Sequence, residues 1–227
     1  MPRETLTREQ IVTAAVAVLD AEGVAGLNVR RLGGRLGVAS TAMYYYVKNK
    51  DELVTLAADL VWREIELPDP AVTEWRSAAA GLAREVYAMV GRHFWLLPAM
   101  STHLIYGPGK ARFDECCLAV FEDAGFTGPH ADHAAATVLM YVIGAAHGSA
   151  AERAWQARMR RAGVDEDAGQ AEVLAYITET AQQFPRLRAR LETSAPNSIE
   201  TLPADTGFEF GLRTVLDGLK ARLDHEK

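Results

Sequence analysis

The sequence predicts an all-α protein in which a small amino-terminal head of three helices precedes a larger helical body. Two observations lead to this prediction. Apolar residues recur at the spacing of one helix face along the chain, and no segment shows a sustained apolar and polar alternation with a period of two. Capping residues, prolines and glycines also divide the chain at intervals that suit helices.

The composition is that of an ordinary globular protein. The chain has 227 residues, of which 49% are hydrophobic and 24% charged, enough for a sizeable core in one or two domains. Its two cysteines, Cys116 and Cys117, are adjacent and too few for a disulfide framework, which favours a reducing, cytoplasmic location. Residues 1–8 lack a signal-peptide apolar region, and no run of about 18 apolar residues is free of charges or breakers. We therefore expect neither secretion nor a membrane partner.

The charge is distributed unevenly along the chain. The net charge is −6, but residues 1–50 contain seven Lys or Arg and four Asp or Glu and carry +3, so the remainder carries −9. A basic head on an acidic body suits a protein that offers one face to a polyanion. A merely uneven surface is the alternative, because such asymmetry is common.

The first helix is expected from about Thr7 to Glu22. The Thr7 hydroxyl can accept a hydrogen bond from the Gln10 amide while the Gln10 side chain reaches back, which is a capping box. Gly23 and Gly26 then stop the helix.

A second helix begins after Asn28, a good N-cap residue, and ends at Gly37, a natural left-handed terminator. Residues 38–40 alone separate it from a third segment, Thr41–Val47. The run Tyr44–Val47 favours a strand by propensity. No second strand lies nearby to pair with it, so a two-turn helix satisfies more of its backbone.

A fourth helix begins at a second capping box, Asn49–Glu52, and is expected to reach about Leu67. The residues from Ser194 to Asp205 are expected to form a mobile loop. The body helices are expected at residues 72–94, 97–104, 109–124, 129–161, 170–184, 186–193 and 205–224. The chain is thus divided into a head (1–50), a connecting helix (51–67) and a body (68–227).

The second and third helices have the pattern of a helix-turn-helix. Leu32 and Leu36 of the second helix can pack against the third helix, whose Met43 and Val47 face inward. The other side of this third helix is then free to enter the major groove of DNA.

These residues resemble the DNA-binding head of the tetracycline repressor (TetR) family. The resemblance covers about residues 7–60 and rests on the segments 27–32, 36–38 and 43–50 with Leu53. The body is similar to the C-terminal domain of the tetracycline-repressor branch at His103–Leu104, Asp123–Phe126, Gly144, Phe208–Leu212 and Leu216–Leu219. The resemblance implies a two-fold dimer joined by a helix bundle, and repression that a small ligand in the body relieves.

The resemblance also implies the roles of particular residues in the head. Asn28 matches a phosphate-contacting cap, and Arg30 a residue that reads bases or phosphates. Tyr44 is expected to pack under the fourth helix as well as contact DNA, and Tyr46 replaces a commoner His. The implied DNA-binding residues are Asn28, Arg30, Ser40, Thr41, Ala42, Tyr44, Tyr45, Tyr46 and Lys50.

No cofactor or metal site is expected in the body. His130 and His133 have the spacing of metal ligands, but solvated imidazoles near a helix start are commoner. His103 resembles the histidine that meets the drug-bound magnesium in the tetracycline repressor. The acid expected later in the long helix is replaced near Gly148 and Ser149, which argues against magnesium-tetracycline as the ligand.

The body offers candidate residues for a ligand pocket and for a dimer interface. An apolar pocket with a few polar groups is expected, although each candidate is by base rate a core residue. The candidate ligand-binding residues are His103, Phe113, Met140, Tyr141 and His147. The candidate interface residues, on two amphipathic helices with more apolar surface than one core needs, are Val142, Gly144, Ala145, Leu212, Val215, Leu216 and Leu219.

The sequence therefore predicts a ligand-responsive transcriptional repressor that binds an inverted-repeat operator in double-stranded DNA as a homodimer. A small, largely apolar effector would release it. A dimeric DNA-binding regulator without a small-molecule ligand is the alternative. A helical enzyme is not favoured, because no nucleophile, base and metal converge and a free cysteine such as Cys117 in an apolar run is usually core.

Overall fold

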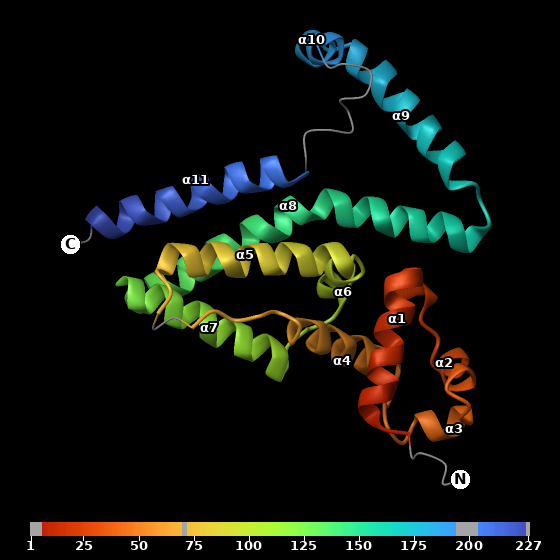
Figure 1. The fold of residues 1–227 in the computed structure, drawn as a ribbon. Helices are drawn as coiled ribbons and strands as arrows, with labels where there is room; N and C mark the ends of the chain where they lie inside the picture. Colours follow the sequence, from red (N-terminus) through yellow and green to blue (C-terminus); the bar gives the residue numbers. More distant parts are fainter. Residues whose placement is uncertain (1–5, 70–71, 194–203, 226–227) are drawn as a thin grey trace.

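The computed structural model describes residues 6–69, 72–193 and 204–225, and within these ranges every regular element is a helix. The predicted all-α class is confirmed. Figure 1 shows the head, formed by α1 to α3, at one end of the molecule, with α4 leading from it into the body. The expected loop at residues 194–205 falls almost entirely on residues 194–203, outside the described ranges.

Helix α1 (Arg8–Gly26) begins at the predicted capping box. The Thr7 hydroxyl accepts from the Gln10 amide at 3.2 Å, and the Gln10 side-chain oxygen accepts from the Thr7 amide at 2.8 Å. The predicted end at Glu22 is a kink, because Gly23 takes a φ of +68° that side chains rarely adopt, and one further turn follows.

Helix α2 (Val29–Arg35) and helix α3 (Ser40–Met43) form the predicted pair. The predicted third helix was too long, because α3 ends at Met43 and residues 44–46 form turns. The Tyr45 and Tyr46 amides donate to carbonyls three residues back, at 3.2 and 3.0 Å. Consecutive aromatic side chains lose rotamer freedom in an α-helix, which disfavours its continuation here.

Helix α4 (Lys50–Trp62) ends earlier than the predicted Leu67. The next helix, α5 (Trp75–Arg92), starts where Glu74 accepts hydrogen bonds from two amides, three residues after the predicted start. The remaining helices end within a few residues of their predicted bounds. They are α6 (Leu96–Thr102), α7 (Pro108–Ala124), α8 (Pro129–Ala162), α9 (Glu166–Gln182), α10 (Pro185–Thr193) and α11 (Ala204–His225).

Helix α8 organises the body. It packs against α5, α7 and α11, and its carboxyl-terminal half also packs against α1 of the head. Helix α4 packs against α1, α6 and α7, so it contacts both parts of the molecule. Helices α9 and α10 pair with each other. The start of α9 packs against α8, and the two helices then lead away from the body in Figure 1, with apolar side chains such as Tyr176 and Ile177 exposed.

Among the described residues, α8 is the one helix with the length and hydropathy to cross a membrane. The observation is weak, because the core helix of a globular protein passes the same test. Val138, Val142 and Ala146 of α8 are buried in the protein core, and 28% of the apolar window is buried within the chain.

Candidate functional site

The segment after the turn of the helix-turn-helix presents one apolar side to the head and the other to solvent. Met43 and Val47 are buried, as predicted, and a Cβ on Gly33 would lie 2.9 Å from Met43 Cγ, so α2 and this segment approach closely. Thr41 and Tyr45 point outward, with Tyr45 89% exposed. This outward side is the surface available to a DNA groove.

The three tyrosines that follow have different environments. Tyr44 is 51% exposed, whereas Tyr46 packs against the core. The packing role expected of Tyr44 therefore falls to Tyr46, because the turns after Met43 rotate residue 46 inward. Ala42 is half-buried, and the side chain of Ser40 lies outside the described part of the chain.

The arginines of α2 differ in their partners. Arg31 and Arg35 both pair with Glu22 of α1, and the hydrogen bond from Arg31 holds the pKa of that carboxyl below its usual value. Arg30, by contrast, is exposed, and no ion pair or side-chain hydrogen bond engages it within the described ranges. Its neighbour Asn28 uses its side-chain oxygen to accept from the Arg30 and Arg31 amides at 2.9 and 3.1 Å, which caps α2.

Two lysines lie at the other end of the outward segment. Lys48 is exposed and Lys50 half-buried, and neither side chain has an ion pair among the described residues. The nearby Arg8 is neutralised by Glu52 of α4 at 2.7 Å. Arg30, Lys48 and Lys50, which have no ion pair within the described ranges, therefore flank the exposed Thr41 and Tyr45, as contact with phosphates on both sides of a groove would require.

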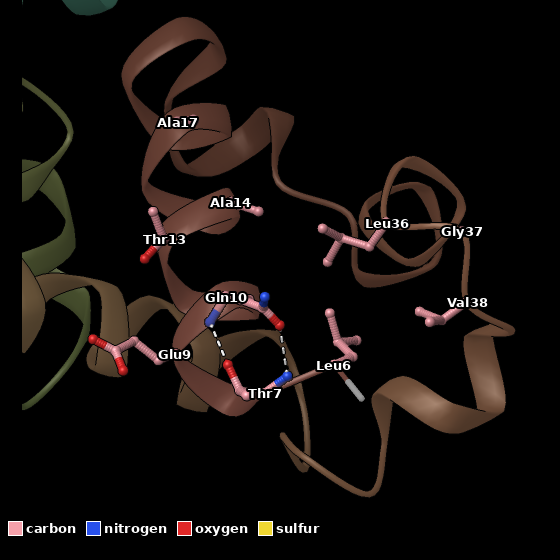
Figure 2. A pocket seen from close by; sticks show the side chains of 10 residues that line it. All are labelled: Leu6, Thr7, Glu9, Gln10, Thr13, Ala14, Ala17, Leu36, Gly37 and Val38. Atoms are coloured by element: carbon pink, nitrogen blue, oxygen red, sulfur yellow. Dashed lines mark hydrogen bonds between the residues drawn. The ribbon is translucent and has the colours of Figure 1, made fainter. Parts of the chain in front are cut away.

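A separate groove of about 680 Å³ lies in the head between α1 and the turn after α2. Figure 2 shows Leu6, Leu36 and Val38 turned toward one another across it, beside the Thr7–Gln10 capping box. Its lining contains one charged residue, Glu9. The groove therefore does not suit a phosphate backbone.

Helix α4 is fixed to the body by Asp59, which is 6% exposed. Its Oδ1 accepts hydrogen bonds from the Gly109 and Lys110 amides at 2.8 and 3.1 Å, at the start of α7. A Cβ on Gly109 would lie 2.3 Å from the Asp59 carbonyl oxygen, so the close approach requires glycine there. The same helix that begins beside Lys50 is thus joined rigidly to α7.

Three of the five predicted ligand-binding residues line cavities in the described part of the chain: Phe113 lines one, and Met140 and His147 line another. His103 Nε2 lies 3.3 Å from Asp51 Oδ1, so His103 contacts the start of the connecting helix α4. Tyr141 donates to the Phe208 carbonyl at 2.7 Å and stacks on the Phe208 ring, which attaches α11 to α8.

Phe113 lines an enclosed apolar cavity between α5, α7 and α8. The space is about 20 Å³, room for about one water molecule. Cys117 also lines it, and burial raises the pKa of this thiol to about 12, so it is protonated and unreactive near neutral pH.

Met140 and His147 line a wider groove of about 800 Å³ between α6 and α8, a volume typical of small-molecule sites. Met100 and Trp155 extend its apolar wall, and Arg158 adds a cation. Sequence reasoning missed Arg158, although its spacing from Trp155 and His147 places all three on one helix face. Within the described ranges, no three His, Cys, Asp or Glu side chains form a group that could hold a metal ion.

The predicted interface residues divide into two groups. Gly144 is exposed, and Ala145 and Val215 are half-buried. The other four are packed inside the chain's own core, where α11 lies on α8 and α5: Val142, Leu212, Leu216 and Leu219. For these four the amphipathic stripe is explained by packing within one chain.

Three features define a DNA-binding transcriptional regulator: a helical architecture throughout the described ranges, an exposed helix-turn-helix segment flanked by cations, and a connecting helix that leads to a body with a ligand-sized groove. The comparisons with known proteins agree. The family model for bacterial regulatory proteins of the tetR family matches residues 11–57, and the model for the tetracyclin repressor-like C-terminal domain matches residues 67–223. The chain belongs to the TetR family of transcriptional repressors.

The chain matches relatives and solved structures over most of their own lengths. The transcriptional repressor DrrR1 of Streptomyces coeruleorubidus is 34% identical over 96% of this chain and 79% of its own. The class A tetracycline repressor of Escherichia coli is 27% identical over 93% of this chain and 89% of its own length. ActR of Streptomyces coelicolor, solved in complex with actinorhodin, superposes with a TM-score of 0.74 at 26% identity and covers 96% of this chain and 97% of its own.

Proposed function

We propose that this protein is a ligand-responsive repressor that binds an inverted-repeat operator as a homodimer and is released by a small, largely apolar molecule. In this proposal the protein is cytoplasmic, and residues 1–50 bind DNA. Residues 51–67 connect this head to the body, and residues 68–227 form the body, which binds the ligand and dimerises. The observation that carries it is the exposed Thr41 and Tyr45 between Arg30 and Lys50, two cations whose side chains have no ion pair among the described residues.

The contacts with DNA follow from this surface. Thr41, Tyr44 and Tyr45 would face base edges or sugars, and Arg30 and Lys50 would bind phosphates or guanine. A segment of about two turns reads too few bases to be specific alone. A dimer that reads two half-sites about 34 to 36 Å apart, or a multiple of that spacing, supplies the missing specificity.

The outer faces of α8 and α11 suit the dimer contact. Met140 is 61% and Phe210 70% exposed on these faces. At Gly144, Gly148 and Gly218 an added Cβ would meet nothing within 4 Å, so packing within the chain does not require glycine there. The close approach of a helix from a second chain would require glycine at these positions, and homodimers are typical of the family.

The groove between α6 and α8 is the proposed effector site. Its wall of Met100, Met140 and Trp155 favours an apolar ligand, and Arg158 and His147 supply polar groups that could orient it. The complex of ActR with actinorhodin supports effector binding in a similar body.

The experiment that tests the operator proposal is selection of bound duplexes from a random pool by the full-length protein. We expect recovered sites with two-fold symmetry and a half-site spacing near one helical turn or a multiple of it. Sites without symmetry, or no enrichment, would contradict the proposal.

A further inference from the structure

A buried histidine lies at the joint between head and body. His93, which follows α5, is 5% exposed. Its Nδ1 lies 2.7 Å from Asp20 Oδ1 of α1, and its Nε2 lies 3.1 Å from Glu64 Oε2, just after α4. The Trp95 indole donates to the same Asp20 oxygen at 2.6 Å. One imidazole thus connects the first helix of the head, the end of the connecting helix and the body.

The geometry requires a particular protonation state. A neutral imidazole has one N–H donor and one acceptor nitrogen, and an ionised carboxylate only accepts. With a carboxylate on each ring nitrogen, a neutral His93 would set a lone pair against a carboxylate oxygen, whereas the imidazolium donates to both. Burial alone lowers the pKa of His93, but the hydrogen bonds to Asp20 and Glu64 outweigh it and raise the pKa above its usual value.

The positive and negative charges that pair at the joint are equal in number when His93 is protonated. Arg92 pairs with Glu64 at 3.2 Å, so two cations face two carboxylates when His93 is protonated. From α8, Arg153 donates to the Gly91 carbonyl, and Arg161 donates to the Glu22 carbonyl at 3.1 Å. These arginines bind backbone carbonyls and leave the carboxylates to His93, Trp95 and Arg92.

We propose that His93, as the imidazolium, is a positioning residue that holds the head in a fixed orientation against the body, so that operator affinity depends on pH. The inference rests on the proposed operator binding. Specific binding by a dimer requires both recognition segments at one spacing, and a fixed joint lowers the cost of reaching it. Loss of the proton loosens the joint and lowers affinity for the operator more than for unrelated DNA.

The pH range follows from the direction of the shift. A raised pKa in the folded protein means that the stabilisation by His93 is complete below its unfolded value near 6.5 and is lost as the pH rises through the higher folded value. Operator affinity should therefore fall as the pH rises above about 6.5, the usual value for histidine.

The test is a titration of the full-length protein against the selected duplex and a scrambled duplex, from about pH 6.5 to about pH 9. The wild-type protein should lose on the order of tenfold in affinity for the selected duplex over this range, and much less for the scrambled one. His93→Gln, which cannot titrate, should bind weakly already at the lower pH and show no further loss. His133→Gln, at an exposed histidine of α8, is the matched control and should keep the wild-type profile.

Two further variants make the test independent of how well His93→Gln folds. Asp20→Asn and Glu64→Gln each remove one carboxylate from the imidazole, so each should move the fall in affinity to lower pH. The proposal would be overturned if the operator affinity of the wild-type protein did not change with pH. It would also be overturned if His93→Gln, or both carboxylate variants, showed the same pH dependence of operator affinity as the wild-type protein. A protein that selects no duplex at all would instead contradict the proposed function.

Discussion

Arg30 and Arg31 are neighbours on α2 with different tasks in the structure. Arg31 donates to Glu22 and to the Gly26 carbonyl, and so attaches α2 to α1. Arg30 is exposed and, among the described residues, has no side-chain partner, so its charge is available to a polyanion.

This difference predicts opposite effects of two matched substitutions. Arg30→Ala should weaken operator binding and leave the free energy of unfolding unchanged. Arg31→Ala should lower stability by at most about 1 kcal/mol, because the pair with Glu22 is partly exposed, with a smaller effect on binding. Fluorescence anisotropy with labelled duplex and urea denaturation measure the two quantities. Equal loss of affinity in both variants would show that α2 does not contact DNA through Arg30.

The adjacent tyrosines supply a second comparison. Tyr45→Ala should change which duplexes are selected without altering the urea midpoint, because its ring is 89% exposed. Tyr46→Ala should lower the midpoint, because its ring packs against the core. If selection with Tyr45→Ala returned the wild-type sites, this ring would have no part in base recognition.

Sequence spacing predicted that Met43 and Val47 face inward, because both lie on the apolar stripe of the head. It did not predict which tyrosine packs, because residues 44–46 are turns and helical periodicity does not apply to them. His103 was assigned to the ligand pocket from its resemblance to a histidine of the family. Its contact with Asp51, 52 positions earlier in the chain, could not be predicted from local spacing.

At the scale of elements, Asp59 attaches α4, which leads from the head, to the start of α7 in the body. Asp59→Ala would leave the Gly109 and Lys110 amides at the start of α7 without their acceptor, in a largely buried place. We expect a loss of about 1 to 3 kcal/mol in the free energy of unfolding. Asp114→Ala, at a more exposed carboxylate of α7 paired with Lys110, is the control and should cost less. Equal stability losses would contradict the role of Asp59.

Most helix starts and ends were predictable because local signals set them. The capping boxes and Gly37 act within a few residues, so the sequence alone places them. The recognition helix was overestimated because the consecutive aromatic residues after Met43 disfavour its continuation, and α4 ends at Trp62, before the expected Leu67. The stripes of α8 and α11 could not be divided between core and partner, because both require the same apolar spacing.

At the scale of the whole molecule, the dimer face is testable by adding charge outside the chain's own core. Phe210→Glu should yield monomers in sedimentation velocity with an unchanged helical circular dichroism spectrum, because the ring is 70% exposed. Leu216 is unsuitable for this purpose, since it is 2% exposed and a charge there would disrupt folding. Leu104→Glu, at another exposed apolar residue, should remain dimeric. A dimer that survived Phe210→Glu would place the interface elsewhere.

The most direct measurement is the stoichiometry of the complex with the selected duplex, by sedimentation velocity with labelled DNA. The account predicts two chains on each duplex, and a large loss of affinity when one half-site is scrambled while the other is intact. A single chain on the intact duplex, or undiminished binding to one half-site, would contradict the claim that this protein reads DNA as a two-fold dimer.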